Sequence, residues 1–178
     1  MSQRSEEWLP VAATVLRCIV QGYDLGLMGI HGLPHWGRVL ENGRRLAQPA
    51  GADPLVVDLF ALFHDARRTN ENRDPGHGAR GADLARQLRS TLPPLTDSQF
   101  ELLCDACDHH TDGQVTSDPT IGVCWDADRL DLWRVGISPT EKLLSTEAAR
   151  DADTLSWAQA RSSDAVVPSF VMTVWLDV

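Results

Sequence analysis

The chain has 178 residues, enough for one domain with a substantial core and too few for two full domains. Its net charge of −9 and isoelectric point of about 5.0 argue against a broad electrostatic grip on nucleic acid or on an anionic membrane surface. Because no stretch resembles a membrane span and the start MSQRSEEWLP lacks the basic and then hydrophobic segments of a secretory signal, we expect a cytoplasmic protein.

Two amphipathic helices are expected in the first fifty residues. The first covers about residues 6–21, with Ser5 as its cap and Gly22 at its end. The second opens within LPHWGRVLENGRRLA, where Pro34 suits a first helical turn. His35 falls on the buried side of this second helix.

The third helix begins at Asp53 and Pro54, which suit the cap and the first position. It leads into LFALFHDARR, residues 59–68, and runs to the adjacent His64 and Asp65. His64 continues the apolar stripe of this helix, so it should point into the core. A buried histidine needs a polar partner.

The segment RRTNENRDPGHG is rich in turn formers and is expected to be a loop that restarts a helix near Asp74 and Pro75. On the new helix His77 shares a face with Leu84 and Leu88. Prolines then break this helix within TLPPLTDSQF.

Thr96 and Gln99 have the spacing of a capping box and predict another helix, on which Phe100 and His110 are in register. After the loop HTDGQVTSDPT, a helix is expected over about residues 120–135. The last third is less regular, and VVPSFVMTVWLDV fits either a strand or a helix. Helical segments joined by short loops predict an all-α bundle in a single domain over residues 1–178.

The four cysteines are expected to be reduced, since their spacing does not suggest the disulfide framework of a small secreted domain. Cys104 and Cys107 form CDAC, a pair that could suggest zinc. No second pair follows at a suitable distance, so a helical interpretation is favoured.

Five successive helices each place one polar group on the buried side: His35, His64, His77, His110 and Asp128. Burying these groups without partners would be costly, and a shared metal cluster satisfies them together. The alternative is a metal-free polar network in the core. Helical phase also leaves one choice open, because Asp126 lies on an apolar face as good as that of Asp128.

The ordered motifs HWGRV, LFHDARR, DPGHGARGA, CDHHTDG and DADRLDL resemble those of the HD-domain metal-dependent phosphohydrolase superfamily. The resemblance covers about residues 30–135 and leaves the N-terminal helix and a C-terminal extension, about residues 140–178, unexplained. It implies an all-α bundle of the HD-domain type, in which a histidine, a His-Asp doublet and a distal aspartate hold a metal.

Carried over by motif, the resemblance implies four primary metal ligands: His35, His64, Asp65 and Asp128. Asp126 then becomes a supporting or structural acid. His77, His109 and His110 resemble the extra histidines of binuclear members, including cyclic-dinucleotide phosphodiesterases. The match to that subgroup is partial, because Thr111 replaces a glutamate and no GYP follows Gly113.

Mixed imidazole and carboxylate ligands suit one or two ions of Mn, Fe, Co, Ni or Zn better than Mg. Such an ion would generate a nucleophile from water at neutral pH. We expect Asp65, Arg68 and His110 to take part in catalysis. An arginine at Arg68 could hold a phosphate, or could equally be a solvated loop residue; Arg38 and Arg129 are weaker candidates.

The preferred hypothesis is a phosphohydrolase of a small phosphate ester, such as a nucleotide or another phosphorylated metabolite. An acidic chain without interleaved aromatic and basic residues is poorly equipped to bind a nucleic-acid polymer. Two alternatives remain: a di-iron HD-type oxygenase and a non-catalytic, metal-binding regulatory domain. The oligomeric state is left open, with a homodimer among the options.

Overall fold

The computed structural model describes residues 13–177, which form helices and turns and contain no strand. This confirms the all-α fold. Residues 13–20 are helical; the rest of the first expected helix and its Ser5 cap lie outside the described residues. The longer helices are α2 (Leu33–Ala50), α3 (Pro54–Phe63), α4 (His77–Gln87), α5 (Asp97–His109), α6 (Pro119–Arg129) and α8 (Ala152–Ser163). The shorter ones are η1 (Arg89–Thr91), η2 (Leu132–Val135), η3 (Glu141–Leu143), α7 (Glu147–Arg150) and η4 (Val171–Trp175).

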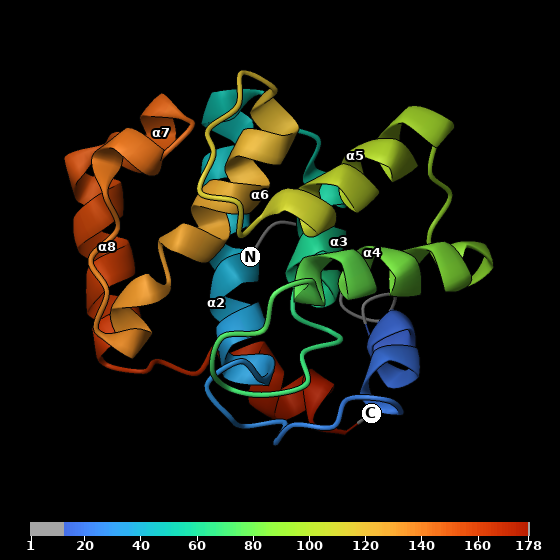
Figure 1. Ribbon diagram of the computed structural model, residues 1–178. Helices are drawn as coiled ribbons and strands as arrows, with labels where there is room; N and C mark the ends of the chain where they lie inside the picture. Colours follow the sequence, from blue (N-terminus) through green and yellow to red (C-terminus); the bar gives the residue numbers. More distant parts are fainter. Residues whose placement is uncertain (1–12, 178) are drawn as a thin grey trace.

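Helix α3 is the centre of the bundle. Every residue from Val56 to Phe63 is buried, as expected for a helix that is apolar on all sides. Figure 1 shows α3 in the middle of the molecule, and it packs against α2, α4, α5 and α6. The C-terminal end of α3 therefore lies inside the protein, and the polar residues that follow it are delivered to the interior.

The expected helix signals are present as specific hydrogen bonds. The Asp53 carboxylate accepts from the backbone N–H groups at the start of α3. Thr96 and Gln99 form the reciprocal capping box of α5, as predicted. Each of these contacts satisfies donors that have no partner within the helix.

Two helix boundaries differ from the sequence-based expectation. Helix α4 begins at His77 instead of near Asp74, because Gly76 precedes it with a left-handed φ of 87°. The helix expected over residues 120–135 ends at Arg129 and is followed by the separate 3₁₀ turn η2. Both changes occur where the chain turns polar side chains inward.

The segment expected to be strand or helix near the C-terminus contains the short π-helical turn η4. A Cβ atom added at Gly37 of α2 would come within 2.7 Å of Val171 and 3.1 Å of Pro168, so this segment packs directly on α2 (Figure 1). The residues after 140 are thus packed against the motif-bearing helices. Within the described residues, no helix has the length and apolar character needed to span a bilayer.

Glycine allows α4 to approach the end of α3 very closely. A Cβ atom at Gly81 would lie 2.3 Å from the carbonyl oxygen of Phe63, and one at Gly78 would lie 2.3 Å from that of Cys107. Both neighbours are backbone atoms and cannot rotate away. This close approach brings the first turn of α4 beside the ends of α3 and α5.

We predict that Gly81→Ala lowers the free energy of unfolding by about 1–3 kcal/mol, because the new methyl group overpacks a rigid contact. Gly26→Ala is the control, since its Cβ would lie 3.9 Å from the nearest atom. Chemical denaturation of both variants measures the difference. Equal stability of the two variants would contradict the close packing of α3 and α4.

Candidate metal centre

Two groups of potential ligands meet inside the bundle. The first consists of His35, His64 and Asp128, and the second of Asp65, His77 and His110. Within each group the candidate ligand atoms all lie within 4.8 Å of one another. Six of the seven metal ligands suggested by the sequence are therefore brought together, from residues spread over most of the bundle.

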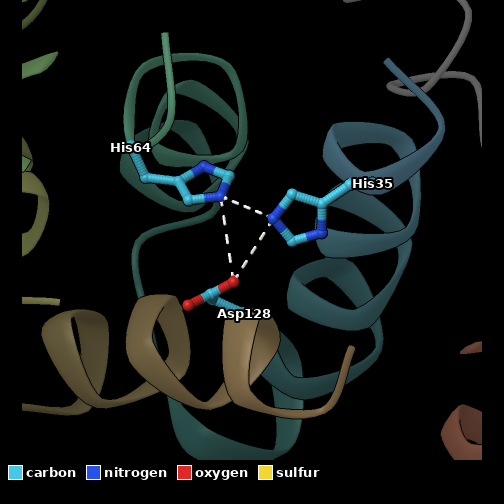
Figure 2. Close-up of side chains that lie close together, drawn as sticks. All are labelled: His35, His64 and Asp128. Atoms are coloured by element: carbon cyan, nitrogen blue, oxygen red, sulfur yellow. Dashed lines mark hydrogen bonds and ion pairs between the residues drawn. The ribbon is translucent and has the colours of Figure 1, made fainter. Parts of the chain in front are cut away.

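Figure 2 shows the first group. His35 lies in the first turn of α2, His64 directly follows α3, and Asp128 lies in the last turn of α6. His35 Nε2 is 3.0 Å from His64 Nε2 and 3.4 Å from Asp128 Oδ1. Both imidazoles are fully buried, whereas the Asp128 side chain is 16 % exposed, so this group is reached from the Asp128 side.

The second group is formed where three helix ends meet. Asp65 follows α3, His77 is the first residue of α4, and His110 directly follows α5. His77 Nε2 lies 2.9 Å from His110 Nε2 and 3.1 Å from Asp65 Oδ1. All three residues are buried.

Asp65 connects the two groups through its separate oxygens. Its Oδ2 lies 3.5 Å from His35 Nε2 and 3.8 Å from His64 Nε2, while its Oδ1 faces His77. A carboxylate in this position can contact an ion in each group at once. This geometry matches a bridging ligand between two metal positions.

Backbone carbonyl groups orient three of the four imidazoles. The Nδ1 atoms of His64, His77 and His110 lie 3.2, 2.7 and 2.7 Å from the carbonyl oxygens of Phe60, Asp74 and Cys107 respectively. A carbonyl oxygen only accepts hydrogen bonds, so each Nδ1 must carry a proton and donate it. The neutral ring then directs the Nε2 lone pair at the centre.

The directions of the Nε2 lone pairs show whether the two ligand groups suit a bound cation. In the second group, the Nε2 lone pairs of His77 and His110 face each other at 2.9 Å, a repulsive contact that a nearby positive charge relieves. Arg68 Nη1, 3.2 Å from His77 Nε2, supplies one such charge, and a bound cation would supply another. Fixing imidazoles through the ring nitrogen remote from the ion is the usual support for metal-binding histidines. The buried imidazole and carboxylate donors could therefore hold a divalent ion.

His35 is oriented by a residue that the motif analysis did not single out. Its Nδ1 lies 2.7 Å from Asp131 Oδ2, and Arg38 donates to both oxygens of the same carboxylate. Asp131 lies three residues after Asp128, close to the same face of the chain, and this spacing was the available signal. Arg38, a weaker candidate for phosphate binding, is buried and paired with Asp131 and the Val166 carbonyl.

The protein environment separates the protonation behaviour of the neighbouring histidines. Burial and nearby Arg134 disfavour a charged His35, but hydrogen bonds to Asp128, Asp131 and Asp65 outweigh them and raise its pKa to about 9. Burial lowers the pKa of His64 to about 3. A positive charge at the first group is therefore favoured on the His35 side, where three carboxylates meet.

The carboxylates of the centre are ionised near neutral pH. Burial acts to raise the pKa of Asp65, but its interactions with the surrounding imidazoles of His64, His35 and His77 hold it well below its usual range. The pKa of Asp128 is also lowered, since the hydrogen bond from His35 outweighs burial. Anionic oxygens and imidazole lone pairs therefore converge on the same space.

Asp126 has a structural role distinct from that of Asp128. Its carboxylate accepts from the backbone N–H groups of Ser145 and Thr146 at 2.7 and 2.8 Å, and from the Thr146 hydroxyl. It therefore fastens the segment before α7 to α6. The side chains of the two acids thus point to different partners, which helical phase alone did not decide.

His109 lies outside the centre, in contrast to the sequence-based expectation. Its side chain is 50 % exposed and its ring nitrogens face Asp112 and Asp105. Neighbouring residues on a helix point about 100° apart, and at the end of α5 this turn places His110 toward the interior and His109 toward solvent.

Arg68 lies beside the second group. Its Nη1 is 3.2 Å from His77 Nε2 and 3.5 Å from Asp65 Oδ1, and its Nη2 donates to the Asn72 carbonyl at 2.6 Å. It is buried, so the interpretation as a solvated loop residue does not hold. Arg129 instead donates through Nη1 to the Leu143 carbonyl.

Two other sequence features have a place near the centre. Cys104 and Cys107 are free residues on α5, in agreement with the helical interpretation of CDAC. His31 also lies close by, with its ring packed edge-on at 6.2 Å from that of His35 and its Nδ1 2.5 Å from Glu71 Oε2. It belongs to neither ligand group.

We compared the chain with models of protein families, with curated proteins and with solved structures, and none of the three comparisons gives a match. The resemblance to the HD-domain superfamily therefore stays a prediction from the motifs.

We predict opposite effects for the two acids of DADRL. Asp128→Asn should reduce bound metal strongly, whereas Asp126→Asn should retain metal and lower the free energy of unfolding by about 1–3 kcal/mol, because it leaves backbone donors without a charged acceptor. Metal analysis of protein purified without chelators, together with denaturation of the metal-free forms, measures both effects. Greater metal loss in Asp126→Asn would make Asp126 the ligand.

The neighbouring histidines His109 and His110 provide a matched test of the number of metal ions. We expect wild-type protein and His109→Ala to bind two ions per chain, and His110→Ala to lose the second. His77→Ala should behave like His110→Ala, because both side chains belong to the same ligand group. A titration that saturates at one ion in every variant would refute the second position.

Proposed function

We propose that this protein is a metal-dependent phosphohydrolase that acts on a small phosphate ester. The observation that supports this best is Asp65, whose oxygens lie 3.5 Å from His35 Nε2 and 3.1 Å from His77 Nε2. Two ions joined by one carboxylate are a common device for stabilising the attacking and leaving oxygens of a displacement at phosphorus.

The ligand chemistry favours Mn, Fe, Co, Ni or Zn over Mg, since four of the six candidate ligands are imidazoles. When bound, such an ion lowers the pKa of a coordinated water and polarises a phosphoryl oxygen. The protein's own contribution is orientation: Asp131 and three backbone carbonyl groups hold the four imidazoles in place.

Arg68 supplies a fixed positive charge next to this centre. Its Nη2 is held by the Asn72 carbonyl, while its Nη1 has only long contacts to His77 and Asp65. Nη1 is therefore free to exchange these contacts for a phosphoryl oxygen. A guanidinium preset in this way offsets charge that develops on phosphate during the reaction.

A second candidate is an oxygenase that uses iron. Each ligand group contains two histidines and one aspartate, the combination found in many non-haem iron sites that activate oxygen. Only measurement of activity separates the two reactions.

The deciding experiment begins with metal analysis of protein purified without chelators. We expect phosphate release from a panel of small phosphoesters in the presence of Mn, Co or Ni, less with Mg, and none after treatment with chelator. If the panel is not hydrolysed and iron-loaded protein consumes oxygen with an organic substrate, the oxygenase replaces the hydrolase.

We predict that Arg68→Ala lowers kcat/KM for phosphate esters by roughly 10²–10³-fold while metal content is retained, because a preset donor to the transition state is lost. Arg86→Ala is the control, since this arginine pairs with Asp83 on the exposed face of α4. Full activity of Arg68→Ala would show that Arg68 has no role in phosphate binding.

A further inference from the structure

A cavity of about 310 Å³ lies directly beside the metal centre. Two candidate metal ligands, His110 and Asp128, form part of its lining. Its size is at the lower end of the range for small-molecule sites. Its apolar wall comes from residues that follow α6: Leu132, Ile137, Pro139 and Leu143.

We propose that this cavity binds the organic group of the substrate and that this group is apolar, an alkyl chain or an aromatic ring. The inference rests on the proposed function, because it takes the phosphate end of the same molecule to lie at the metal centre. The proposal narrows the substrate class to phosphate monoesters of apolar alcohols or phenols.

Two apolar residues of the cavity wall are exposed to solvent, as expected for a site that a ligand covers. Ile137 is 54 % exposed and Leu143 is 40 % exposed, although both line a cavity next to buried polar groups. Exposed apolar side chains grouped around a concave surface are typical of ligand sites. An apolar group in the cavity would remove both side chains from water.

The wall is held in place before any ligand binds. Arg129 donates through Nη1 to the Leu143 carbonyl, and the Ile137 N–H donates to the Leu132 carbonyl at 3.2 Å. Asp126 fastens the next residues, Ser145 and Thr146, to α6. The same helix that carries Asp128 therefore also sets the distance between the metal centre and the apolar wall.

One polar group in the lining is unsatisfied. Arg129 lines the cavity and is buried, and its Nη2 has no hydrogen-bond partner among the described residues. This atom is shielded from solvent, and the guanidinium lies over the Trp125 ring with its Cζ 5.6 Å from the ring centroid. Arg129 therefore contributes a positive charge to the lining and no free donor to the ligand.

The same lining disfavours a longer phosphate chain. Arg129 is its only arginine or lysine, and Asp128 contributes a negative charge. A second or third phosphate would be placed against apolar side chains with little compensating charge. The proposal therefore predicts that nucleoside diphosphates and triphosphates are poorer substrates than monoesters of apolar alcohols or phenols.

The test uses phosphonates, which cannot be hydrolysed, so that it does not depend on turnover. Manganese-loaded protein is titrated calorimetrically with phenylphosphonate and with methylphosphonate. We expect phenylphosphonate to bind at least about tenfold more tightly, since the ring buries apolar surface. Ile137→Ser should weaken phenylphosphonate binding at least about threefold and leave methylphosphonate unchanged, and Leu143→Ser should do the same.

Met172→Ser is the matched control, because Met172 is also an exposed apolar residue but does not line the cavity. It should change neither dissociation constant, and metal content should be equal in all variants. Equal affinity for the two phosphonates, no binding of either, or equal weakening of both in Ile137→Ser would overturn the proposal.

Two outcomes distinguish failure of the phosphohydrolase proposal from failure of the apolar-cavity proposal. Hydrolysis of phenyl phosphate and methyl phosphate with equal kcat/KM would keep the phosphohydrolase and reject the apolar subsite. A preference for phenylphosphonate that is lost in Ile137→Ser, without hydrolysis of any ester, would keep the subsite and reject the phosphohydrolase.

Discussion

The centre depends on hydrogen bonds from imidazole Nδ1 atoms to acceptors that cannot donate in return. The carbonyl groups of Phe60, Asp74 and Cys107 fix three of the rings, and their Nε2 lone pairs must then share one buried space. These carbonyl groups belong to the ends of helices or to the loop before α4, and those of Phe60 and Asp74 each accept a backbone N–H as well, from His64 and His77. The helix ends therefore supply both the ligands and the groups that orient them, and the close contact at Gly81 is needed to bring these ends together.

The C-terminal part of the chain is joined to the centre through Asp131. This carboxylate faces His35 and Arg38, and its backbone carbonyl accepts from the Ser162 hydroxyl of α8 at 2.9 Å. Arg38 in turn donates to the Val166 carbonyl at 2.9 Å. The orientation of one candidate ligand is thus tied to residues far along the chain, outside the region covered by the motifs. Loss of these C-terminal contacts would therefore disturb the orientation of the His35 imidazole.

Helix α6 combines three tasks within four residues. Asp126 anchors the segment before α7, Asp128 faces the first ligand group, and Arg129 holds the Leu143 carbonyl beside the cavity. If the proposed function holds, the site for the reacting group and the site for the rest of the substrate would share this one rigid element. Such an arrangement keeps the two at a constant separation, which benefits either a phosphohydrolase or an oxygenase.

The sequence by itself determined the all-α class, the caps of α3 and α5, and the inward placement of His35, His64, His77 and His110, because these depend on local hydrogen bonds and on a 3.6-residue period. The period shows that a residue points inward but not which neighbours it meets. Helical phase left Asp126 and Asp128 equivalent, and only the tertiary structure shows Asp126 bound to the backbone before α7 and Asp128 facing His35. Only the tertiary structure also shows that His109 is exposed and that Asp131 fixes an imidazole. The physical reason is that these roles depend on contacts between residues up to about a hundred positions apart, as between His35 and Asp131, whose relative placement is set by helix packing.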